Sequence, residues 1–409
     1  MQRILSTELA HHVGATVKVA GWIHRRRLLK SVAFLILRDA SGFAQVVTTP
    51  GELEKLSEES VVEITATVTA NAAAPAGVEL TSPLIRVLSE VAEALPVELH
   101  RPALTASLPT QLDHAALALR HPTRSAALRS MAAATAGFRS ALERQRFVEI
   151  HTPKIVGSAT ESGANVFRLD WFGRPAFLAQ SPQLYKQMMV GVFERVYEVG
   201  PVFRAEPHDT ARHLAQYTSL DAELGFIADH RDVMAVLTSV IAEMVGHTGA
   251  AVEVPAEIPA VHFSEALRIA GAPADEPDLA PAHERALGEW ALREHGSELL
   301  YVTGYPMRKR PFYTHPQPSD PTWSNSFDLL FRGLEMVTGG QRLHHYEDYV
   351  AALAGDTEPY AGYLEAFRFG MPPHGGFAIG LERFVARLTG AANVREVTAF
   401  PRDLHRLTP

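Results

Sequence analysis

Along the first hundred residues, apolar and polar positions alternate in short runs, as they do in half-buried β-strands. A dense apolar run at Phe34–Leu37 is followed by the turn-like Asp39–Gly42 and by another run at Phe43–Thr48, and Asn71–Gly77 has the composition of a loop. Two further runs place their apolar members on one face: Val17, Val19 and Ile23, and then Val62, Ile64, Ala66 and Val68. Short strands separated by turn signals predict a small closed β-barrel over residues 1–98.

The pattern then changes. Residues 99–122 are rich in Pro, His, Thr and Ala, which is typical of a linker. Strand-like and helical stretches alternate beyond Pro153, so a second domain is expected over residues 123–409, with an Ala- and Pro-rich variable insertion at about 250–285. Spacings of three and four predict that this domain opens with a helix whose mainly apolar face carries Leu128, Met131, Thr135, Phe138 and Leu142.

Composition narrows the class of protein. The chain has 409 residues, 46% of them hydrophobic, and a formal charge of −8, so it is long enough for two or three domains and too acidic for a general nucleic-acid coat protein. Any RNA contact needs a local basic patch, and the dense basic cluster is Arg25, Arg26, Arg27 and Lys30. The absence of cysteine excludes disulfides, Cys-ligated zinc and thiol catalysis, and it fits a cytoplasmic protein. No apolar stretch of membrane-spanning or signal-peptide type occurs.

Common nucleotide-binding loops are missing, but two arginine-bearing segments offer another route to ATP. Neither G-x-x-x-x-G-K-[ST] nor a helix-opening G-x-G-x-x-G is present. The first segment runs from Phe203-Arg204-Ala205-Glu206 to Asp221, and the second from Gly375 to Arg383. A guanidinium is a planar fork of donors that suits phosphate and carboxylate oxygens. Glycines ahead of Arg383 would let the backbone come close to a flat ligand.

Together these segments resemble the class II aminoacyl-tRNA synthetases, and within them the archaeal-type aspartyl-tRNA synthetases. Arg146–Pro153 resembles the first family motif, which builds a dimer interface, Phe203–Glu223 the second and Gly376–Arg383 the third. The likeness runs in order from about residue 13 to the C-terminus. It implies an α+β protein, in which an all-β OB-fold barrel that binds the anticodon precedes a catalytic domain with an antiparallel sheet and flanking helices. It also implies a homodimer and ATP as a substrate.

The resemblance assigns roles in the nucleotide site. Arg204 should contact the α-phosphate and the substrate carboxylate, Glu206 the adenine amino group, and Arg212 and Arg383 the γ-phosphate. Glu335 matches the glutamate that binds Mg²⁺, and Thr338 stands where a serine hydroxyl is usual; one carboxylate and one hydroxyl suit a hard cation that takes its other ligands from phosphate and water. Arg204, Arg383 and Glu335 are the expected catalytic set. The expected ATP-binding residues also include Ala205, His213, Leu214, Tyr217, which should stack on adenine, Gly380, Leu381 and Glu382.

Aspartate specificity is implied by Gln180–Gln187 and Gly339–His344, which resemble segments peculiar to aspartate enzymes. Lys186 and Arg342 should both face the substrate side chain, where an amide would leave two cations uncompensated. Glu161 should lie on a loop that closes over the amino acid. The α-amino group and the rest of the amino acid should be bound by Ser181, Gln183, Leu184, Tyr185, Arg204, Asp221 and Thr338.

For the tRNA, Phe34 matches a stacking aromatic and Gln45 the residue that reads the central uridine of aspartate and asparagine anticodons. His24 and Pro83 resemble the nondiscriminating branch, which charges both tRNA(Asp) and tRNA(Asn) with aspartate and hands the second product to a tRNA-dependent amidotransferase. A discriminating aspartyl enzyme, an asparaginyl enzyme and a non-catalytic RNA-binding paralogue are the alternatives. Two departures from the family pattern stand out, Arg146 in place of a glycine and Leu28–Ser31 in place of the more typical Asp-Leu-Gly-Gly turn.

Overall fold

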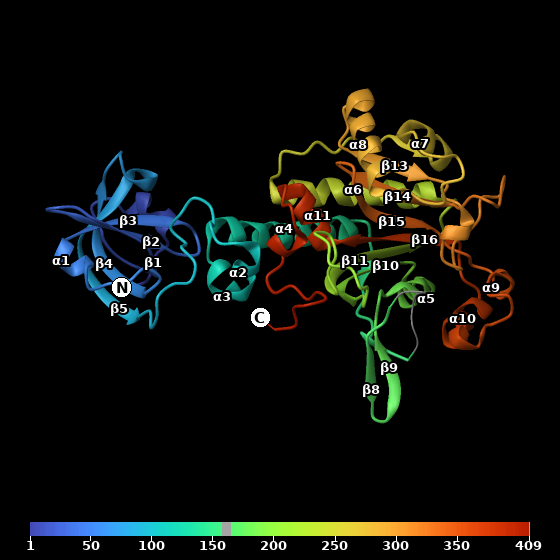
Figure 1. The fold of residues 1–409 in the computed structure, drawn as a ribbon, viewed down its shortest axis with the longest axis horizontal. Helices are drawn as coiled ribbons and strands as arrows, with labels where there is room; N and C mark the ends of the chain where they lie inside the picture. Colours follow the sequence, from blue (N-terminus) through green and yellow to red (C-terminus); the bar gives the residue numbers. More distant parts are fainter. Residues whose placement is uncertain (158–164, 409) are drawn as a thin grey trace. The chain divides into compact units, whose positions relative to one another are not determined.

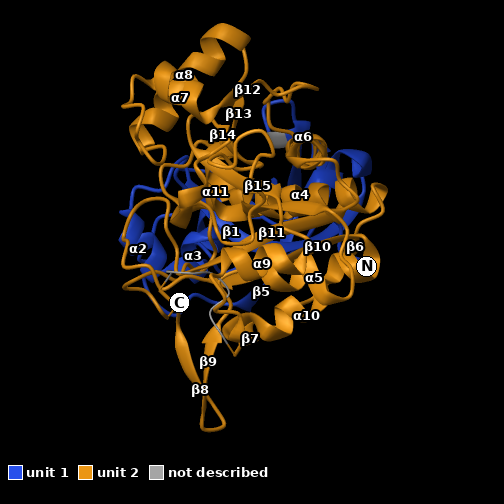
Figure 2. Cartoon of the chain, turned by 90° about the vertical axis from the view of Figure 1, so that its right-hand side faces the viewer, with its two compact units in different colours: residues 1–121 blue, residues 122–409 orange. Residues whose placement is uncertain are grey.

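The computed structural model describes residues 1–157 and 165–408, and the chain divides into two compact units, Met1–His121 and Pro122–Pro409 (Figure 2). None of the helices in this described part has the length and apolar character needed to cross a membrane. Each unit has its own hydrophobic core.

Unit 1 contains the predicted closed barrel, with strand order β1-β2-β3-β5-β4. The alternation seen in the sequence is confirmed, because Val19, Ile23 and Ile64 are fully buried while their neighbours face outward. The last strand had no strong sequence pattern and was not predicted. The strands are β1 (Thr16–Leu28), β2 (Ala33–Arg38), β3 (Phe43–Thr48), β4 (Val61–Ala70) and β5 (Val78–Ser89), and the short helices are η1 (Ser6–His12), α1 (Pro50–Leu53) and η2 (Pro75–Gly77).

Local backbone geometry explains two details of the barrel, the glycine at position 21 and the proline at position 83. A Cβ at Gly21 would lie 2.2 Å from the carbonyl oxygen of Arg38, so β1 can pass this close to β2 only with glycine there. Pro83 lies within β5 where the register with β4 shifts, next to Ser82 at φ 51°. A bulge is where a strand tolerates proline, because no ladder hydrogen bond is required from it.

Residues after the barrel, expected to be a plain linker, contain two short helices, α2 (Leu108–Asp113) and α3 (Ala115–Ala118). The Ser107 hydroxyl accepts from the backbone N–H of Thr110 and caps α2. His121 closes the segment by bonding to the carbonyl of Arg101 at 2.9 Å. The segment is thus ordered by caps and local hydrogen bonds that composition alone does not reveal.

Unit 2 is built on an eight-stranded sheet in the order β12-β13-β14-β15-β16-β11-β10-β6. Its central pairs are antiparallel, as the resemblance implied, whereas the pairs at both edges, β12/β13 and β10/β6, are parallel. A separate three-stranded sheet, β7-β9-β8, extends away from it (Figure 1). The strands are β6 (Val148–Glu149), β7 (Ile155–Val156), β8 (Arg168–Trp171), β9 (Arg174–Leu178), β10 (Arg195–Phe203), β11 (Gln216–Gly225), β12 (Ala260–His262), β13 (Leu299–Thr303), β14 (Ser326–Phe331), β15 (Glu335–Gln341) and β16 (His374–Gly380).

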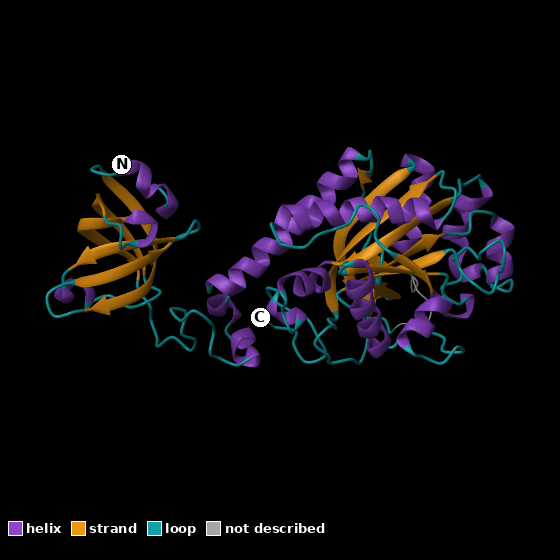
Figure 3. Cartoon of the chain, turned by 90° about the horizontal axis from the view of Figure 1, so that it is seen from above, coloured by secondary structure: helices purple, strands orange, loops and turns teal. Residues whose placement is uncertain are grey.

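Two long helices, α4 and α6, cover one side of this sheet (Figures 1 and 3). The region expected to be an insertion supplies β12 and α7, and β12 extends the sheet at its edge. The helices are α4 (Pro122–Arg144), α5 (Gln183–Phe193), α6 (His230–Thr248), α7 (Phe263–Ala270), α8 (Pro281–His295), η3 (Met307–Lys309), α9 (Tyr346–Ala352), η4 (Glu358–Tyr360), α10 (Ala361–Arg368), α11 (Leu381–Thr389) and η5 (Val394–Glu396).

The predicted face of α4 is partly wrong. Phe138 and Leu142 are buried as expected, but Leu128 and Thr135 are only half-buried. The contact with α6 is made instead through small residues, because a Cβ at Gly137 would lie 2.7 Å from the carbonyl oxygen of Glu243. The prediction relied on large apolar residues and therefore missed part of the buried face. That face also carries Ala134 and Ala141.

The two departures from the family pattern are local. Arg146 follows the end of α4 at φ 64°, in the left-handed region that favours glycine, which explains why glycine is usual there. At the other site, the N–H of Leu29 donates to the carbonyl of Val32 at 3.0 Å, so the turn after β1 closes without glycine. Neither position lines the pocket described next.

Candidate active site and RNA-binding face

A pocket of about 360 Å³ lies on the sheet of unit 2. It is formed where the ends of β10, β11, β15 and β16 meet the start of α11. It is lined by Arg204, Glu206, Arg212, His213, Leu214, Tyr217, Ser219, Glu284, Glu335, Met336, Thr338, Ala378, Ile379, Gly380, Glu382, Arg383 and Val394. Segments separated by up to 190 residues in sequence are thus brought to one site, and most of the residues expected to bind ATP are among them.

Strand register explains this convergence. Thr338 on β15 pairs with Ala378 on β16, which pairs in turn with Asp221 on β11. Residues two apart on a strand face the same side, so Ser219, Asp221 and Glu223 share one face of β11. The antiparallel sheet therefore places Thr338 on the same side as the polar face of β11, with the small side chain of Ala378 between them.

At one end of the pocket lie the expected nucleotide-binding arginines. The Arg204 guanidinium lies 5.9 Å from the centre of the Tyr217 ring and 3.8 Å from Glu206. Arg383, on α11, donates to the carbonyl of Glu335 at 3.3 Å. Both arginines are half-buried, so their charges are partly desolvated yet remain open to a ligand.

His213 and Arg212 lie on the loop between β10 and β11. The His213 ring bonds to the Thr210 hydroxyl at 2.6 Å, and burial together with the charge of Arg383 lowers the pKa of His213. His213 is therefore a neutral group of the pocket near pH 7.

Three other expected ATP residues make contacts within the protein, two of them through polar groups. The Ala205 N–H donates to the carbonyl of Asn165, and Glu382 accepts from the N–H of Thr218 at 2.9 Å. Leu381 belongs to the hydrophobic core. A Cβ at Gly380 would make ordinary contact with the Tyr217 ring, whereas one at Gly376 would lie 2.1 Å from the Glu223 carboxylate. Gly376 thus makes room for a protein carboxylate.

Glu335 and Thr338 form a small oxygen-rich wall of the pocket. The Thr338 hydroxyl donates to Glu335 at 3.3 Å. Burial, with the negative charge of Asp328 next in size, raises the pKa of Glu335 to about 7. Asp328 is itself paired with Arg310 at 3.1 Å, and Glu284 accepts from the N–H of Glu335. This wall carries an excess of carboxylates that a cation would relieve.

Next to the pocket, four charges are buried together. Lys186 lies 3.0 Å from Asp221 and 3.4 Å from Glu223, and Arg342 donates to Glu223 at 2.9 Å. All four are at most 6% exposed. Burial favours the neutral form of Glu223, but Arg342 and Lys186 outweigh it and hold its pKa below the usual range. The hydroxyl of Ser219, which lines the pocket, donates to Asp221 and joins this cluster to the open site.

The other expected aspartate residues lie at the start of α5. Ser181 and Gln183 are buried, and the Ser181 hydroxyl accepts from the N–H of Gln183 at 3.2 Å. The side-chain nitrogen of Gln183 has no protein partner among the residues that the structure describes. Leu184 packs in a small apolar cluster and Tyr185 is half-buried. Glu161 lies outside the described residues.

On the barrel, the outer face of β1, β2 and β3 brings together three of the expected tRNA residues. Ile36, two residues from Phe34 on β2, pairs with Gln45, and His24 lies at the bulge opposite them on β1. The Gln45 amide nitrogen donates to Glu79 at 3.0 Å, and because a carboxylate only accepts, this contact occupies the donor end of the amide and not its oxygen. Pro83 lies on β5, which is not a neighbour of β1.

Arg38 fixes the chemical form of His24. Its guanidinium bonds to Nδ1 of His24 at 3.1 Å, and a guanidinium can only donate. Nδ1 therefore accepts, and the proton of the neutral ring is on Nε2. Burial, reinforced by the Arg38 charge, lowers the pKa of His24 to about 4. Arg38 is held in turn by Glu59 at 2.7 Å, to which Arg120 also pairs.

Sequence reasoning missed several residues of these sites. Glu223 could have been found because it continues the polar face of Ser219 and Asp221 along β11, opposite the apolar face of Leu220, Ala222 and Leu224. Asp328 is a lone acid in the apolar run of β14. Glu284 lies in the region taken as an insertion, and nothing local marks it. In the basic cluster, Arg26 donates to the carbonyls of Leu53 and Leu56 and so has a structural contact.

The comparisons with known proteins decide the family. Residues 107–404 match the family model described as tRNA synthetases class II (D, K and N), and residues 17–88 match the OB-fold nucleic acid binding domain. The chain belongs to the class II tRNA synthetases. It is 47% identical to the aspartate–tRNA(Asp/Asn) ligase of Thermus thermophilus over the whole of both chains, and 45% identical to that of Deinococcus radiodurans over 100% of this chain and 99% of the relative. The aspartate–tRNA(Asp) ligase of Thermoplasma acidophilum is 36% identical over 98% and 97%.

Solved structures give the same fold for this synthetase. The asparaginyl-tRNA synthetase of Pyrococcus horikoshii complexed with asparaginyl-adenylate superposes with a TM-score of 0.92 at 28% identity, covering all of both chains. A putative aspartyl-tRNA synthetase from Leishmania major gives 0.89 at 28% identity, over 100% of this chain and 95% of the other. Because neighbours of both specificities share the fold, the choice of amino acid has to be argued from the side chains.

Proposed function

We propose that this synthetase activates L-aspartate with ATP and transfers it to tRNA(Asp) and also to tRNA(Asn). The observation that carries the proposal is the buried cluster of Lys186, Arg342, Asp221 and Glu223 beside the pocket. The similarity to ligases of this double tRNA specificity over the full chain supports it.

Counting charges shows why the cluster suits aspartate. Without substrate, two cations and two carboxylates cancel. Aspartate brings an α-ammonium group, which Asp221 would bind, and a side-chain carboxylate, which would face Lys186 and Arg342 beside Glu223. The sum within the buried site is still zero. Asparagine would leave one positive charge uncompensated, and an unpaired buried charge costs several kcal/mol, of the order of 3–5 kcal/mol when a buried pair is broken.

The reaction needs no nucleophile from the protein. An α-carboxylate oxygen of aspartate attacks the α-phosphorus of ATP, the bond from that phosphorus to the bridging oxygen breaks, and pyrophosphate leaves. A ribose hydroxyl at the 3′ end of the tRNA then attacks the carbonyl carbon of the adenylate, and AMP leaves. Arg204 would hold the α-phosphate and carboxylate in line, while Arg212 and Arg383 would bind the γ-phosphate and offset charge in the transition state. Tyr217 would stack on adenine, beside Glu206.

Mg²⁺ fits the wall made by Glu335 and Thr338. These two supply hard oxygen ligands 3.3 Å apart in a carboxylate-rich wall. Bound there with ATP, the ion would neutralise phosphate charge. Glu335 and Thr338 would hold it, and the carbonyl contact of Arg383 with Glu335 keeps the arginine beside the same phosphates.

For the tRNA, Phe34 would stack on an anticodon base and the Gln45 oxygen would accept from the N3–H of the central uridine. His24 would present a neutral N–H donor. Cytidine and uridine both carry an O2 acceptor, so such a donor does not separate the third anticodon bases of the two tRNAs. This tolerance supports charging of both, and a tRNA-dependent amidotransferase would then convert aspartyl-tRNA(Asn).

A homodimer in the cytoplasm completes the proposal. Large apolar side chains are exposed near the first motif: Val148, Val192, Phe193 and Phe226. A second copy of the chain would cover such a set.

Two assays test this function. Pyrophosphate exchange should be brisk with aspartate and at least about 100-fold slower with asparagine, as expected for a charge left unpaired. Purified tRNA(Asp) and tRNA(Asn) should both accept aspartate. Exchange with asparagine alone would identify an asparaginyl enzyme instead, and acceptance by tRNA(Asp) alone would identify a discriminating one.

A further inference from the structure

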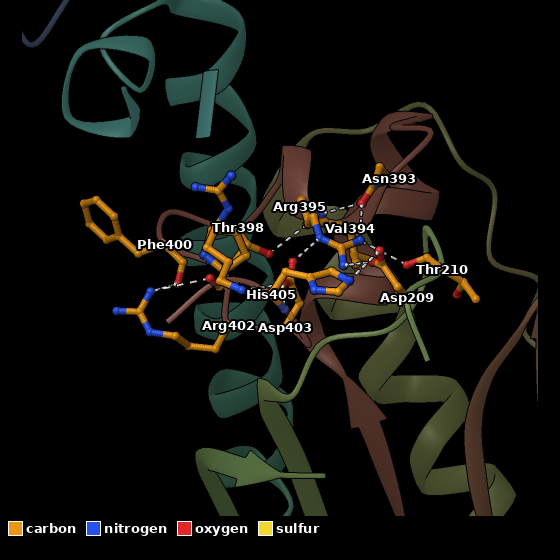
Figure 4. Close-up of polar contacts among 12 residues, drawn as sticks. Asp209, Thr210, Asn393, Val394, Arg395, Thr398, Phe400, Arg402, Asp403 and His405 are labelled. Carbon is orange, nitrogen blue, oxygen red and sulfur yellow. Dashed lines mark hydrogen bonds and ion pairs between the residues drawn. The ribbon is translucent and has the colours of Figure 1, made fainter. Parts of the chain in front are cut away.

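Distant parts of unit 2 meet around Arg395, away from the reacting groups. Arg395 lies in η5 and pairs with Asp209 of the loop between β10 and β11 at 2.7 Å, and with Asp403 of the C-terminal segment at 2.6 Å (Figure 4). Its third donor reaches the carbonyl of Thr210 at 3.1 Å. One side chain thus fastens two segments that are nearly 200 residues apart in sequence.

The geometry is specific to arginine. Nε, Nη1 and Nη2 each donate to a different residue, which a single ammonium group cannot reproduce. The side chains of Arg395 and Asp403 are 8% and 7% exposed. Burial would raise the pKa of Asp403, but hydrogen bonds from Arg395 and from backbone N–H groups outweigh it and keep the pKa below the usual range.

Backbone contacts extend this junction to both sides of Arg212 and His213. The N–H of Val394 donates to the carbonyl of Ala211, and the N–H of Ala215 donates to the carbonyl of Arg402, both at 2.8 Å. Val394 also lines the nucleotide pocket. The stretch that carries two expected ATP ligands is therefore held at each end by the C-terminal part of the chain.

We propose that Arg395 is a positioning residue for the nucleotide site. By pairing with Asp209 and Asp403 it holds the β10–β11 loop against the C-terminal segment, so that Arg212 and His213 already lie at the pocket before ATP binds. Without this clasp the loop populates other conformations, and apparent affinity falls by the fraction that remains competent. The proposal rests on the proposed function in that the pocket is taken to bind ATP. Lys186 and Arg342 pair with Asp221 and Glu223 on β11 and not with Arg395, Asp209 or Asp403, so the site proposed for the aspartate side chain is left unchanged.

Arg395→Ala, Arg395→Lys and Asp209→Asn test it in full-length protein by pyrophosphate exchange, with ATP and aspartate varied separately. We expect Arg395→Ala to raise the KM for ATP about tenfold while the KM for aspartate stays within about twofold. Lysine should rescue part of the loss because it can keep one ion pair. Arg395→Ala/Asp209→Asn should be little worse than Arg395→Ala, since both changes remove the same contact.

Arg402→Ala is the matched control, because its guanidinium donates to the carbonyls of Phe400 and Pro401 in its own segment. Equal rises in both KM values, or a lower melting temperature with unchanged KM values, would overturn the proposal. If Arg395→Ala does not fold, Asp209→Asn decides, because the Asp209 side chain is 48% exposed in the pair. The change in its KM for ATP is then compared with the change in its KM for aspartate. Calorimetric titration of ATP separates the two hypotheses. Wild-type protein that binds ATP but exchanges with no amino acid refutes the proposed function. The ATP affinities of the variants, measured by the same titration, then decide on the clasp.

Discussion

The buried charge cluster beside the pocket and the outer face of the barrel, which we propose to recognise aspartate and the anticodon, differ in how they handle charge. The first buries four full charges that pair with one another, at 3.0 Å for Lys186 and Asp221. The second presents half-buried rings and neutral hydrogen-bonding groups, and it contains a histidine whose pKa is lowered by burial and, to a smaller extent, by the charge of Arg38. Charge balance in a desolvated site penalises a wrong ligand by several kcal/mol, whereas a half-exposed neutral contact contributes about 1 kcal/mol.

This difference matches the selectivity proposed for each region. Aspartate and asparagine differ by one charge, which the buried cluster would detect under the proposed function. The two anticodons differ at a pyrimidine whose O2 atom is common to both, so a single neutral donor accepts either. Strict choice of amino acid and relaxed choice of tRNA would therefore follow from how each surface handles charge.

Lys186→Met should have the largest effect, because it leaves two buried carboxylates facing one arginine. Removing one partner of a buried ion pair costs about 3–5 kcal/mol, so kcat/KM for aspartate in pyrophosphate exchange should fall about 150- to 5000-fold. The relative use of asparagine should rise, since the preference for a negative side chain is lost. Steady-state exchange with both amino acids measures it.

Lys154→Met is the control for that prediction. Lys154 also pairs with a carboxylate, Glu198 at 2.7 Å, but it does not line the pocket. Its KM for aspartate should stay at the wild-type value. A Lys186→Met protein that kept full preference for aspartate would show that charge balance does not set the specificity.

Arg383→Ala probes the nucleotide end, where the charges are only half-buried. Loss of one donor that acts on transition-state charge costs about 100-fold in kcat. The expected loss is therefore equal to or smaller than that of Lys186→Met. The comparison is made in exchange assays at saturating aspartate. Arg268→Ala, which breaks an exposed pair with Glu265 on α7, should leave the rate unchanged. Unimpaired activation in Arg383→Ala would refute its phosphate role.

The sequence predicted the barrel and the order of the chemical segments, but not how charges are shared among them. Alternation around Val19 and Ile64 was sufficient for strands because period two is a local signal. The place of Glu223 between Lys186 and Arg342 depends on the register of β11 with β16 and on the missing Cβ of Gly376. No local pattern contains that information.

Other failures have the same physical origin. The buried face of α4 is set by Gly137, because the absence of a side chain there lets α6 come close. A search for large apolar residues therefore misses it. Arg395 has partners 8 and 186 residues away, and nothing near it in sequence indicates a clasp. Contacts made through absent side chains or through distant partners become visible only in the fold.

Phe34→Ala should weaken both tRNAs together. Stacking of a base on an aromatic ring is worth about 1–3 kcal/mol, so the KM for either tRNA should rise about 5- to 100-fold while pyrophosphate exchange without tRNA is unchanged. Charging assays with each tRNA measure this. Leu84→Ala, a change at a 74% exposed apolar residue on β5, serves as the control and should alter neither. A loss confined to one tRNA would mean that Phe34 takes part in reading the third base.

Arg38→Gln should have the smallest effect on activity and the clearest spectroscopic one. In the folded protein the pKa of His24 is about 4, below its ordinary 6.5, so the neutral ring stabilises the fold fully above pH 6.5 and this stability is lost as the pH falls from 6.5 towards 4. Removing the Arg38 charge and donor should move the pKa of His24 upward, although burial, the larger cause, stays.

Nitrogen-15 NMR titration of the ring should find the Nε2–H form across pH 5–8 in the wild type and a protonating ring in the variant. The ratio of tRNA(Asp) to tRNA(Asn) charging should then change by no more than about tenfold, the worth of one hydrogen bond, and only at acidic pH. A wild-type ring that titrates near 6.5 would remove the basis for a neutral, tolerant anticodon face.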